Sequence, residues 1–393
     1  EIEKHPIVRE KYRVLSEAAH AVASPQIRNM GTLSGNICQE PRCWYYRNPE
    51  NTFHCLRKDG KTCNALTGEN RVHSLFGGAR VNNPPCASSC PGTVNVSEYL
   101  EKIREKDLPR AAQILLLNNP IPAVTGRVCP HFCEEECNRS QYDEAVSIRG
   151  VERFIGDYIL ENANEIMNPP EKETGKGVAV IGSGPAGLSA AFYLRMRGHR
   201  VVVFDKMEEA GGMLTYGIPA YRLPKDIVRN QVKAIENTGV KFRLKTDVGK
   251  DVSLASVKKE FDSLFLATGA WSQPSIGLEG ETLTKSGLEF LTNINSGIQE
   301  ILGHKVVVIG GGNVAVDVGI TSKRLGAGEV TLACLENREE MPALEGEIQQ
   351  ALEEGIKLMP SWGPLKILER NGRITGIELV KCTSVFEDQC QFS

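Results

Sequence analysis

The sequence predicts an α/β protein with two doubly wound nucleotide-binding domains, preceded by a helical domain and a small cysteine-rich N-terminal segment. Two observations carry this prediction. The order strand, glycine-rich turn, helix, strand occurs twice after residue 176, and parallel doubly wound sheets are built from that unit. Nine of the twelve cysteines lie in the first 137 residues, before either unit, so the two halves of the chain differ in chemistry.

The overall composition is that of an ordinary globular protein, with 393 residues of which 41% are hydrophobic and 24% charged. A formal net charge of -3 gives no electrostatic reason to expect binding to nucleic acid or a membrane surface. Apolar runs such as 114–117 are far shorter than the roughly 18 to 20 residues that cross a bilayer, so no membrane span is expected. The charged first residues argue against a signal peptide and predict a cytoplasmic location, and the missing initiator Met indicates a cut or processed N-terminus.

Composition divides the chain into three blocks, and the repeated nucleotide unit divides the last block again, which gives four predicted domains. The first block is rich in Arg, Asn, Gly and Cys, the second mixes cysteine loops with helical stretches, and the last alternates β-branched runs with helical segments. A polar, proline-broken stretch at 168–177 indicates the linker between the second block and the last. The predicted domains are 1–80, 81–170, 171–285 and 286–393. Apolar residues three and four apart predict helices over 96–105, 108–117 and 148–160.

The cysteine spacing favours metal or cluster binding over disulfides, because the chain carries nucleotide motifs and no export signal. Cys86 and Cys90 form C-x3-C-P, the end of a ferredoxin-type run. Cys129, Cys133 and Cys137 are spaced four residues apart, which predicts one face of a helical turn. Four ligands must converge on each iron–sulfur cubane. Zinc and plain reduced thiols are the alternatives.

The first nucleotide unit runs from residue 178 to 205: a buried strand, a G-x-G-x-x-G turn, a helix, and a second strand that ends in an acid. This is the Rossmann-like fingerprint. Gly182 permits the tight turn, Gly184 lets the backbone approach a pyrophosphate, and Gly187 lets the helix pack on the strand. The helix N-terminus offers N–H groups to the phosphates. We expect Asp205 to accept hydrogen bonds from the adenosine ribose.

The second unit, 306–336, repeats the pattern with Gly310, Gly312 and Ala315 in the turn. Its second strand ends at Glu336, which would repel a 2′-phosphate and accept from a 2′-hydroxyl, so the sequence predicts NADH over NADPH. The neighbouring Arg338 works in the opposite direction. A solvated strand-end acid is the alternative for both Glu336 and Asp205. Two nucleotide sites in one chain suggest hydride transfer between a nicotinamide and a flavin.

From Cys86 to its end, about three quarters of the chain, the sequence resembles the small subunit of glutamate synthase and the matching part of dihydropyrimidine dehydrogenase. The matching motifs are CASSCP at 86–91, TGRVCPHFCEEEC at 125–137, VERFIGD at 151–157, GSGPAG at 182–187, GGMLTYGIPAYRLPK at 211–225, LATGA at 266–270, GGGNVAVD at 310–317 and NREEMPA at 337–343. The resemblance implies that the first Rossmann unit binds FAD and that the second is a nicotinamide domain inserted into the flavin domain.

The resemblance also implies site residues. The FAD contacts are Gly182, Gly184, Pro185, Ala186, Gly187, Asp205, Lys206, Gly211, Gly212, Leu214, Arg222, Ala267, Thr268 and Gly269. The nicotinamide nucleotide contacts are Gly310, Gly312, Asn313, Val314, Ala315, Asp317, Glu336 and Arg338. One [4Fe-4S] cluster is held by Cys90, Cys129, Cys133 and, as an unusual oxygen ligand, Glu152, while Cys86 and Cys137 belong to a second cluster.

The chain departs from these families at several points. The second cluster lacks its upstream C-x2-C pair, where 81–85 reads VNNPP, so Cys86 and Cys137 join the first cluster, use N-terminal ligands or stay free. Glu152 has an alternative role as a solvated helix residue. Leu335 and Glu336 stand where NADPH-using relatives carry paired arginines. No Gly-Asp flavin segment follows residue 380, so we expect a fragment or an incomplete flavin site.

The N-terminal domain resembles a different family. The run ASPQIRNMGTLSGNI at 23–37 is similar to an FAD-contacting stretch of the flavoprotein subunit of molybdenum hydroxylases. The runs PRCWYYRN, HCLRKDGKTC and GENRVHSLFGG resemble the inserted cluster-binding loop of the 4-hydroxybenzoyl-CoA reductase type. This resemblance implies a cluster on Cys43, Cys55 and Cys63, with His73 or the competing Cys38 as the fourth ligand. The whole chain would then hold one to three clusters.

The predicted function is therefore that of an electron-transfer subunit. It would pass electrons between NADH, FAD and [4Fe-4S] clusters, to or from a catalytic redox subunit in a hetero-oligomer. The N-terminal resemblance suggests a molybdenum or tungsten enzyme as that partner. The alternatives are an NADPH-dependent glutamate synthase small subunit and a zinc-stapled nucleotide-binding scaffold.

Overall fold

The computed structural model describes residues 85–141, 143–273, 275–383 and 385. The predicted N-terminal cluster ligands Cys43, Cys55, Cys63 and His73 lie outside the described residues. Nearly all described residues belong to one compact unit, Cys86–Ser140 with Ala145–Ser393. Across the described ranges, no helix has the length and apolar character needed to cross a membrane.

A helical region comes first, as predicted. Its helices are α6 (Pro85–Ser88), α7 (Val96–Arg104), α8 (Leu108–Leu116), α9 (Pro122–Val128), α10 (Phe132–Glu135), the 3-10 turn η3 (Asn138–Gln141), α11 (Ile148–Glu161) and α12 (Ala163–Ile166). The three predicted helices are α7, α8 and α11, each within one residue of its expected end. Side-chain caps fix the starts of two of them. Asn95 accepts from the Glu98 N–H at 3.3 Å, and Asp107 accepts from the Arg110 N–H at 3.0 Å.

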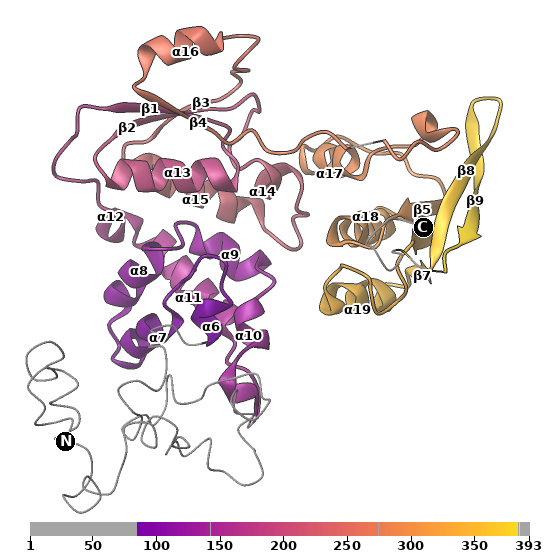
Figure 1. Ribbon diagram of the computed structural model, residues 1–393, viewed down its shortest axis with the longest axis horizontal. Helices are drawn as coiled ribbons and strands as arrows, with labels where there is room; N and C mark the ends of the chain where they lie inside the picture. Colours follow the sequence, from indigo (N-terminus) through magenta and orange to yellow (C-terminus); the bar gives the residue numbers. More distant parts are fainter. Residues whose placement is uncertain (1–84, 142, 274, 384, 386–393) are drawn as a thin grey trace, which may run out of the picture. The chain divides into compact units, whose positions relative to one another are not determined.

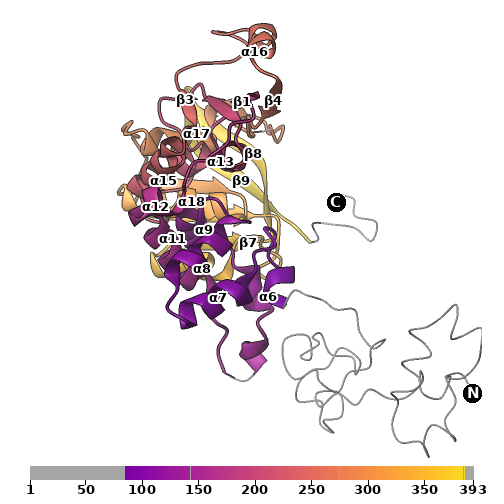
Figure 2. The ribbon, with the colours of Figure 1, turned by 90° about the vertical axis from the view of Figure 1, so that its left-hand side faces the viewer.

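Helices α9 and α11 cross at a close approach that two glycines permit. A Cβ atom on Gly126 would lie 2.5 Å from the Arg153 Cα, and one on Gly156 would lie 2.4 Å from the Ala123 N. Arg127 fastens the crossing with two hydrogen bonds to Asp157, of 2.7 and 2.9 Å. Figures 1 and 2 both show α8, α9 and α11 packed side by side. The crossing sets the position of α11 against the cysteine loops that follow α9.

The first sheet has four parallel strands in the order β3-β2-β1-β4. They are β1 (Gly177–Ile181), β2 (Arg200–Phe204), β3 (Lys241–Arg243) and β4 (Ser263–Leu266). The associated helices are α13 (Pro185–Met196), α14 (Met213–Tyr216), α15 (Lys225–Asn237) and α16 (Leu254–Glu260). Alternate strand residues face opposite sides: Val180 and Val203 join the core with α13, whereas Val202 and Phe204 pack against Val257 of α16. Figure 1 shows α16 on one face of the sheet and α13 on the other, the doubly wound arrangement that the sequence predicts.

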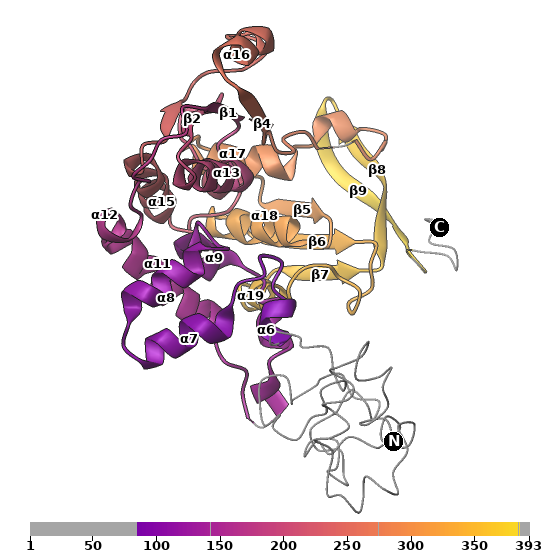
Figure 3. The ribbon, with the colours of Figure 1, turned by 60° about the vertical axis from the view of Figure 1, so that its left-hand side comes forward.

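The second sheet has three parallel strands in the order β5-β6-β7. Its elements are η4 (Glu281–Leu283), α17 (Gly287–Asn295), β5 (Lys305–Ile309), α18 (Asn313–Arg324), β6 (Glu329–Cys334), α19 (Glu345–Glu353) and β7 (Lys357–Pro360). Figure 3 shows the three strands side by side, with α18 over them. Buried residues of α18 and α19 pack with Val330 and Leu332 of β6 to form a separate core.

One element was not predicted. β8 (Trp362–Arg370) and β9 (Arg373–Lys381) form an antiparallel hairpin after the parallel strands. The turn is Asn371-Gly372, with φ of 55° and 73°. Asn-Gly is the strongest short signal for a two-residue hairpin, so the sequence contained the information.

Candidate functional site

The first glycine turn is closed by contacts that leave no room for side chains. A Cβ on Gly187 would lie 1.9 Å from the Gly182 carbonyl oxygen, so the start of α13 sits directly on the end of β1. Gly182 has a φ of +106°, and a Cβ there would lie 2.1 Å from the Ala267 oxygen. Pro185 and Ala186 open α13, whose N-cap is Gly184. The turn therefore has the glycine roles that the fingerprint requires.

The other predicted flavin segments meet this turn. Gly211 donates its N–H to the Ser183 oxygen at 3.0 Å, and a Cβ on Gly212 would lie 2.8 Å from the Gly184 Cα. The Ala267-Thr268-Gly269 segment follows β4 and touches the turn through Ala267. Three segments distant in sequence thus converge where parallel strands end, the usual place for a nucleotide in such sheets.

Asp205 lies at this edge but already has partners. Its carboxylate is buried and accepts from the Ser183 N–H at 2.7 Å, the Ser183 hydroxyl at 2.5 Å and the Met207 N–H at 2.9 Å. These bonds hold the glycine turn against β2. A carboxylate offers about four acceptor positions, so capacity remains for a ribose hydroxyl. Ribose binding by Asp205 stays a prediction.

The second glycine turn carries Glu336 beside it. A Cβ on Gly311 would lie 2.9 Å from Glu336 Oε2, so the carboxylate stands next to the turn at the end of β6. The Ser361 N–H donates to the Glu336 carbonyl at 2.8 Å and fixes its backbone. Arg338 is turned to Glu345, with an ion pair of 2.6 Å. Its guanidinium is therefore engaged by a carboxylate.

The remaining residues of the second turn have defined places. Asn313 starts α18, and its Oδ1 accepts from the Leu344 N–H at 3.2 Å. Val314 is exposed in the first turn of α18, and Ala315 packs close to Gly310. Asp317, one turn further along, is buried and accepts hydrogen bonds from the segment that precedes α15.

Arg222, predicted as a flavin contact, joins that segment to two helices of the second domain. It donates to Asp317 at 2.7 Å and to Glu347 of α19 at 2.5 Å. The Tyr221 hydroxyl also donates to Asp317, at 3.1 Å. Burial raises the pKa of both carboxyls, and Arg222 opposes the rise. This ion-pair group links residues that are far apart in sequence.

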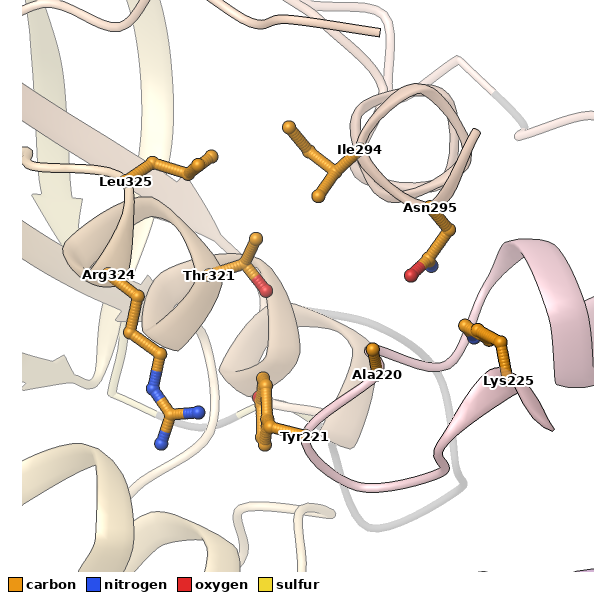
Figure 4. Close-up of a pocket in the computed structure, with 8 residues that line it drawn as sticks. All are labelled: Ala220, Tyr221, Lys225, Ile294, Asn295, Thr321, Arg324 and Leu325. Carbon is orange, nitrogen blue, oxygen red and sulfur yellow. The ribbon is translucent and has the colours of Figure 1, made fainter. Parts of the chain in front are cut away.

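A cavity of about 280 Å³ adjoins this group at the C-terminal end of α18 (Figure 4). Its lining residues are Ala220, Tyr221, Lys225, Ile294, Asn295, Thr321, Arg324 and Leu325. Lys225 Nζ donates to the carbonyls of Leu214 and Ile218, and burial lowers the pKa of Lys225 to about 8. None of the eight is a predicted nucleotide contact, so the cavity is separate from both glycine turns.

The prediction that Cys129, Cys133 and Cys137 share one helical face is wrong. Helix α9 ends at Val128, Cys129 is extended, and His131 has a left-handed φ of 58° before the short helix α10. Pro130 explains the break, because the residue before a proline is driven out of the α region. Loops rather than a single helix therefore position these cysteines.

The predicted ligands of the first cluster are nonetheless neighbours. The charges that act on Cys133 are those of Glu152, Cys129 and Cys90, followed by that of Glu134. Cys86 is instead influenced by Cys137 and then Cys90. Cys90 therefore influences cysteines of both predicted clusters, and the division of the ligands between two clusters stays a prediction. The five described cysteines of this region are free thiols.

Burial dominates the electrostatics of these ligands. It raises the pKa of Cys133 to about 12 and that of Glu152, which is 8% exposed, to about 7. Burial also raises the pKa of Cys129. A positive centre such as ferric iron would favour the anionic form of these groups.

Within the described ranges, no group of three or more Cys, His, Asp or Glu side chains is arranged to hold a metal ion. A cubane spreads its ligands over four iron atoms and accepts wider spacing. Backbone N–H groups also point to sulfur, from His131 to Cys129 at 3.4 Å and from Val146 to Cys137 at 3.5 Å. Donors of this kind accompany cluster sulfurs. Cys90, Cys129, Cys133 and Glu152 are the residues that would hold the group.

Sequence reasoning missed three residues of the candidate sites. Tyr99 of α7 is fully buried among the predicted cluster ligands, and Glu347 bonds Arg222. Gly311 lies beside Glu336. Only Gly311 had a local signal, as the middle glycine of Gly310-Gly311-Gly312.

Comparison with known proteins identifies the family. The family described as pyridine nucleotide-disulphide oxidoreductase matches residues 176–380, more than half of the chain. The chain belongs to this family. In this oxidoreductase, residues 78–164 also match dihydropyrimidine dehydrogenase domain II, 4Fe-4S cluster. Residues 1–67 match the FAD binding domain in molybdopterin dehydrogenase.

Three relatives show the sequence similarity of this oxidoreductase to known proteins. It is 38% identical over 307 residues to the NADPH-Fe(3+) oxidoreductase subunit beta of Geobacter sulfurreducens, covering 76% of this chain and 45% of that one. The glutamate synthase [NADPH] small chain of Escherichia coli is 35% identical, with 76% and 67% covered. The NAD-dependent dihydropyrimidine dehydrogenase subunit PreT homolog of Salmonella typhi is 32% identical, with 73% and 70% covered. The chain spans about half the length of the Geobacter relative. Both resemblances found in the sequence are confirmed.

Proposed function

We propose that this oxidoreductase is the electron-input part of a larger enzyme, which passes electrons between NADH, FAD, [4Fe-4S] clusters and a partner catalytic subunit. A bound flavin takes two electrons from a nicotinamide together and releases them one at a time, which suits it to link NADH to clusters. One observation carries the proposal. A single compact unit contains two glycine turns, each on its own parallel sheet, and five neighbouring cysteines.

The residues have simple tasks in this proposal. The Gly182–Gly187 turn and the Gly211-Gly212 segment bind the flavin nucleotide, and the turn at Gly310 binds NADH. A protein that binds both nucleotides would lower the entropic cost of bringing the hydride donor and the hydride acceptor together. No acid or base is required. Flow in the reverse direction, toward NAD⁺, uses the same parts.

The choice of NADH rests on Glu336. The carboxylate lies beside the second glycine turn, where it would accept from a ribose 2′-hydroxyl and repel a 2′-phosphate. The neighbouring cation Arg338 is paired with Glu345. The relatives include proteins named for NADPH and proteins named for NAD. The preference for NADH is therefore inferred from the residues of this chain.

Glu336→Arg is expected to shift the preference toward NADPH. The change removes the repulsion and adds a guanidinium that can hold the 2′-phosphate, so the ratio of kcat/KM for NADPH to that for NADH should rise at least ~10-fold, or about 1.4 kcal/mol. Flavin reduction by each nucleotide, followed in a stopped-flow instrument, measures the ratio. Glu353→Arg, on the exposed side of α19, makes the same charge change and should leave the ratio unaltered. An unchanged ratio in Glu336→Arg would contradict the assignment.

We also propose that the partner is a molybdenum or tungsten enzyme. Support comes from the match of residues 1–67 to the FAD binding domain in molybdopterin dehydrogenase. The relatives named as subunits support a hetero-oligomer. Co-purification of a catalytic subunit that contains molybdenum or tungsten tests this part of the proposal.

The deciding measurement is iron, acid-labile sulfide, zinc and flavin per chain after anaerobic purification. About eight irons with equal sulfide would indicate two cubanes, and about four would indicate one. NADH should then bleach the flavin and produce the electron paramagnetic resonance signal of reduced clusters. Zinc without sulfide would overturn the electron-transfer proposal and favour the zinc-stapled scaffold.

A further inference from the structure

The hydroxyl of Tyr99 is buried without a partner. Tyr99 lies on α7, its side chain is fully buried, and its Oη has no hydrogen bond within the described part of the chain. Burying a hydroxyl in this way costs roughly 1 to 3 kcal/mol. A phenylalanine would fill the same volume without that cost. The hydroxyl therefore points to an acceptor that the described polypeptide does not supply.

The surroundings of Tyr99 indicate what that acceptor is. After burial, the strongest influences on the hydroxyl are the charges of Glu152, Cys133, Cys86 and Cys90. Tyr99 also packs in one apolar core with Cys133, Cys86 and Cys90. A phenol hydroxyl carries a proton that it can donate in a hydrogen bond.

We propose that Tyr99 donates a hydrogen bond to the ligand shell of the cluster held by Cys90, Cys129 and Cys133, and thereby raises its reduction potential. This inference rests on the proposed function, because it requires a cluster at that place. On reduction one electron enters, no covalent bond is made or broken, and no proton leaves Tyr99. The reduced state carries one more negative charge, so a hydrogen-bond donor stabilises it more than the oxidised state. Tyr99 is thus a tuning residue and not a ligand.

Tyr99→Phe in the full chain tests the inference. The anaerobically reconstituted protein should keep the iron and sulfide of the wild type, since packing is preserved. A redox titration with dithionite, followed by electron paramagnetic resonance, should show the cluster about tenfold harder to reduce, a fall of about 59 mV for one electron. The control is Tyr193→Phe, which removes a hydroxyl bonded to the Leu116 carbonyl at 3.3 Å. That variant should leave the potential unchanged.

A second substitution covers the case in which Tyr99→Phe loses its cluster. Incorporation of 3-fluorotyrosine at position 99 keeps the ring and makes the hydroxyl a stronger donor, so the potential should rise. If both Tyr99 variants contain iron and sulfide and their equilibrium constants for cluster reduction lie within about twofold of the wild-type value, the inference is overturned and the proposed function is not. An equal shift in Tyr193→Phe would also overturn the inference. A wild-type chain that assembles no iron and sulfide would overturn the proposed function together with the inference.

Discussion

Cys133→Ser is expected to remove one whole cluster, about four irons and the matching sulfide per chain. Cys133 is the most deeply buried of the cysteines that group with Glu152, and burial raises the pKa of its thiol to about 12. Iron must displace that proton, and a serine hydroxyl, harder and less acidic, cannot replace the soft thiolate. Iron and acid-labile sulfide analysis, with the visible spectrum, measures the loss.

A matched variant separates ligand loss from general damage. Cys334→Ala removes another buried thiol, which lies in β6 of the second sheet, and should leave iron and sulfide at the wild-type level. Full iron content in Cys133→Ser would show that the cluster does not use this cysteine.

Gly187→Val is expected to abolish flavin binding. Any Cβ at this position would lie 1.9 Å from the Gly182 oxygen, so the glycine turn must open and α13 must move away from β1. The phosphate-binding N–H groups of the helix start would be displaced with it. Flavin released by denaturing the purified protein, quantified per chain, should fall from near one to a few per cent. Circular dichroism reports whether the rest of the chain is folded.

The control for this variant adds a methyl group where there is room. Gly346 in α19 has no atom within 4 Å of a built Cβ, so Gly346→Ala should keep the flavin and stabilise its helix by up to about 1 kcal/mol. Normal flavin content in Gly187→Val would refute the assignment of this turn to the nucleotide.

Local features of the nucleotide-binding sheets could be predicted from the sequence. The two strands expected within the unit at 178–205 are observed at Gly177–Ile181 and Arg200–Phe204. Runs of β-branched residues and a glycine fingerprint fix these elements over a few neighbouring positions, so no distant contact is needed to recognise them. The Asn371-Gly372 dipeptide is an equally local signal, but the hairpin that it forms was not predicted.

The contacts that complete the site depend on the tertiary fold. Arg222 pairs with Asp317 and Glu347, which are 95 and 125 positions away, and no periodicity reports such a pairing. The prediction that Cys129, Cys133 and Cys137 share one helical face was wrong for a different reason. A spacing of four predicts one face only if the helix continues, and Pro130 followed by the left-handed His131 ends it. The role of Tyr99 could not be predicted without knowing that its side chain is buried, because the position of a tyrosine in an amphipathic helix does not indicate what its hydroxyl bonds.

The glycine crossing between α9 and α11 has a consequence for mutational tolerance. At Gly126 and Gly156 even alanine would collide with backbone of the opposite helix. Side-chain rearrangement cannot relieve a clash with backbone, so compensating substitutions in the surrounding core are of little use. In a saturation library these two positions should accept almost no substitution, while exposed neighbours such as Phe154 should vary freely. Amino-acid substitutions in this helical region should therefore accumulate on the outer surfaces of the two helices.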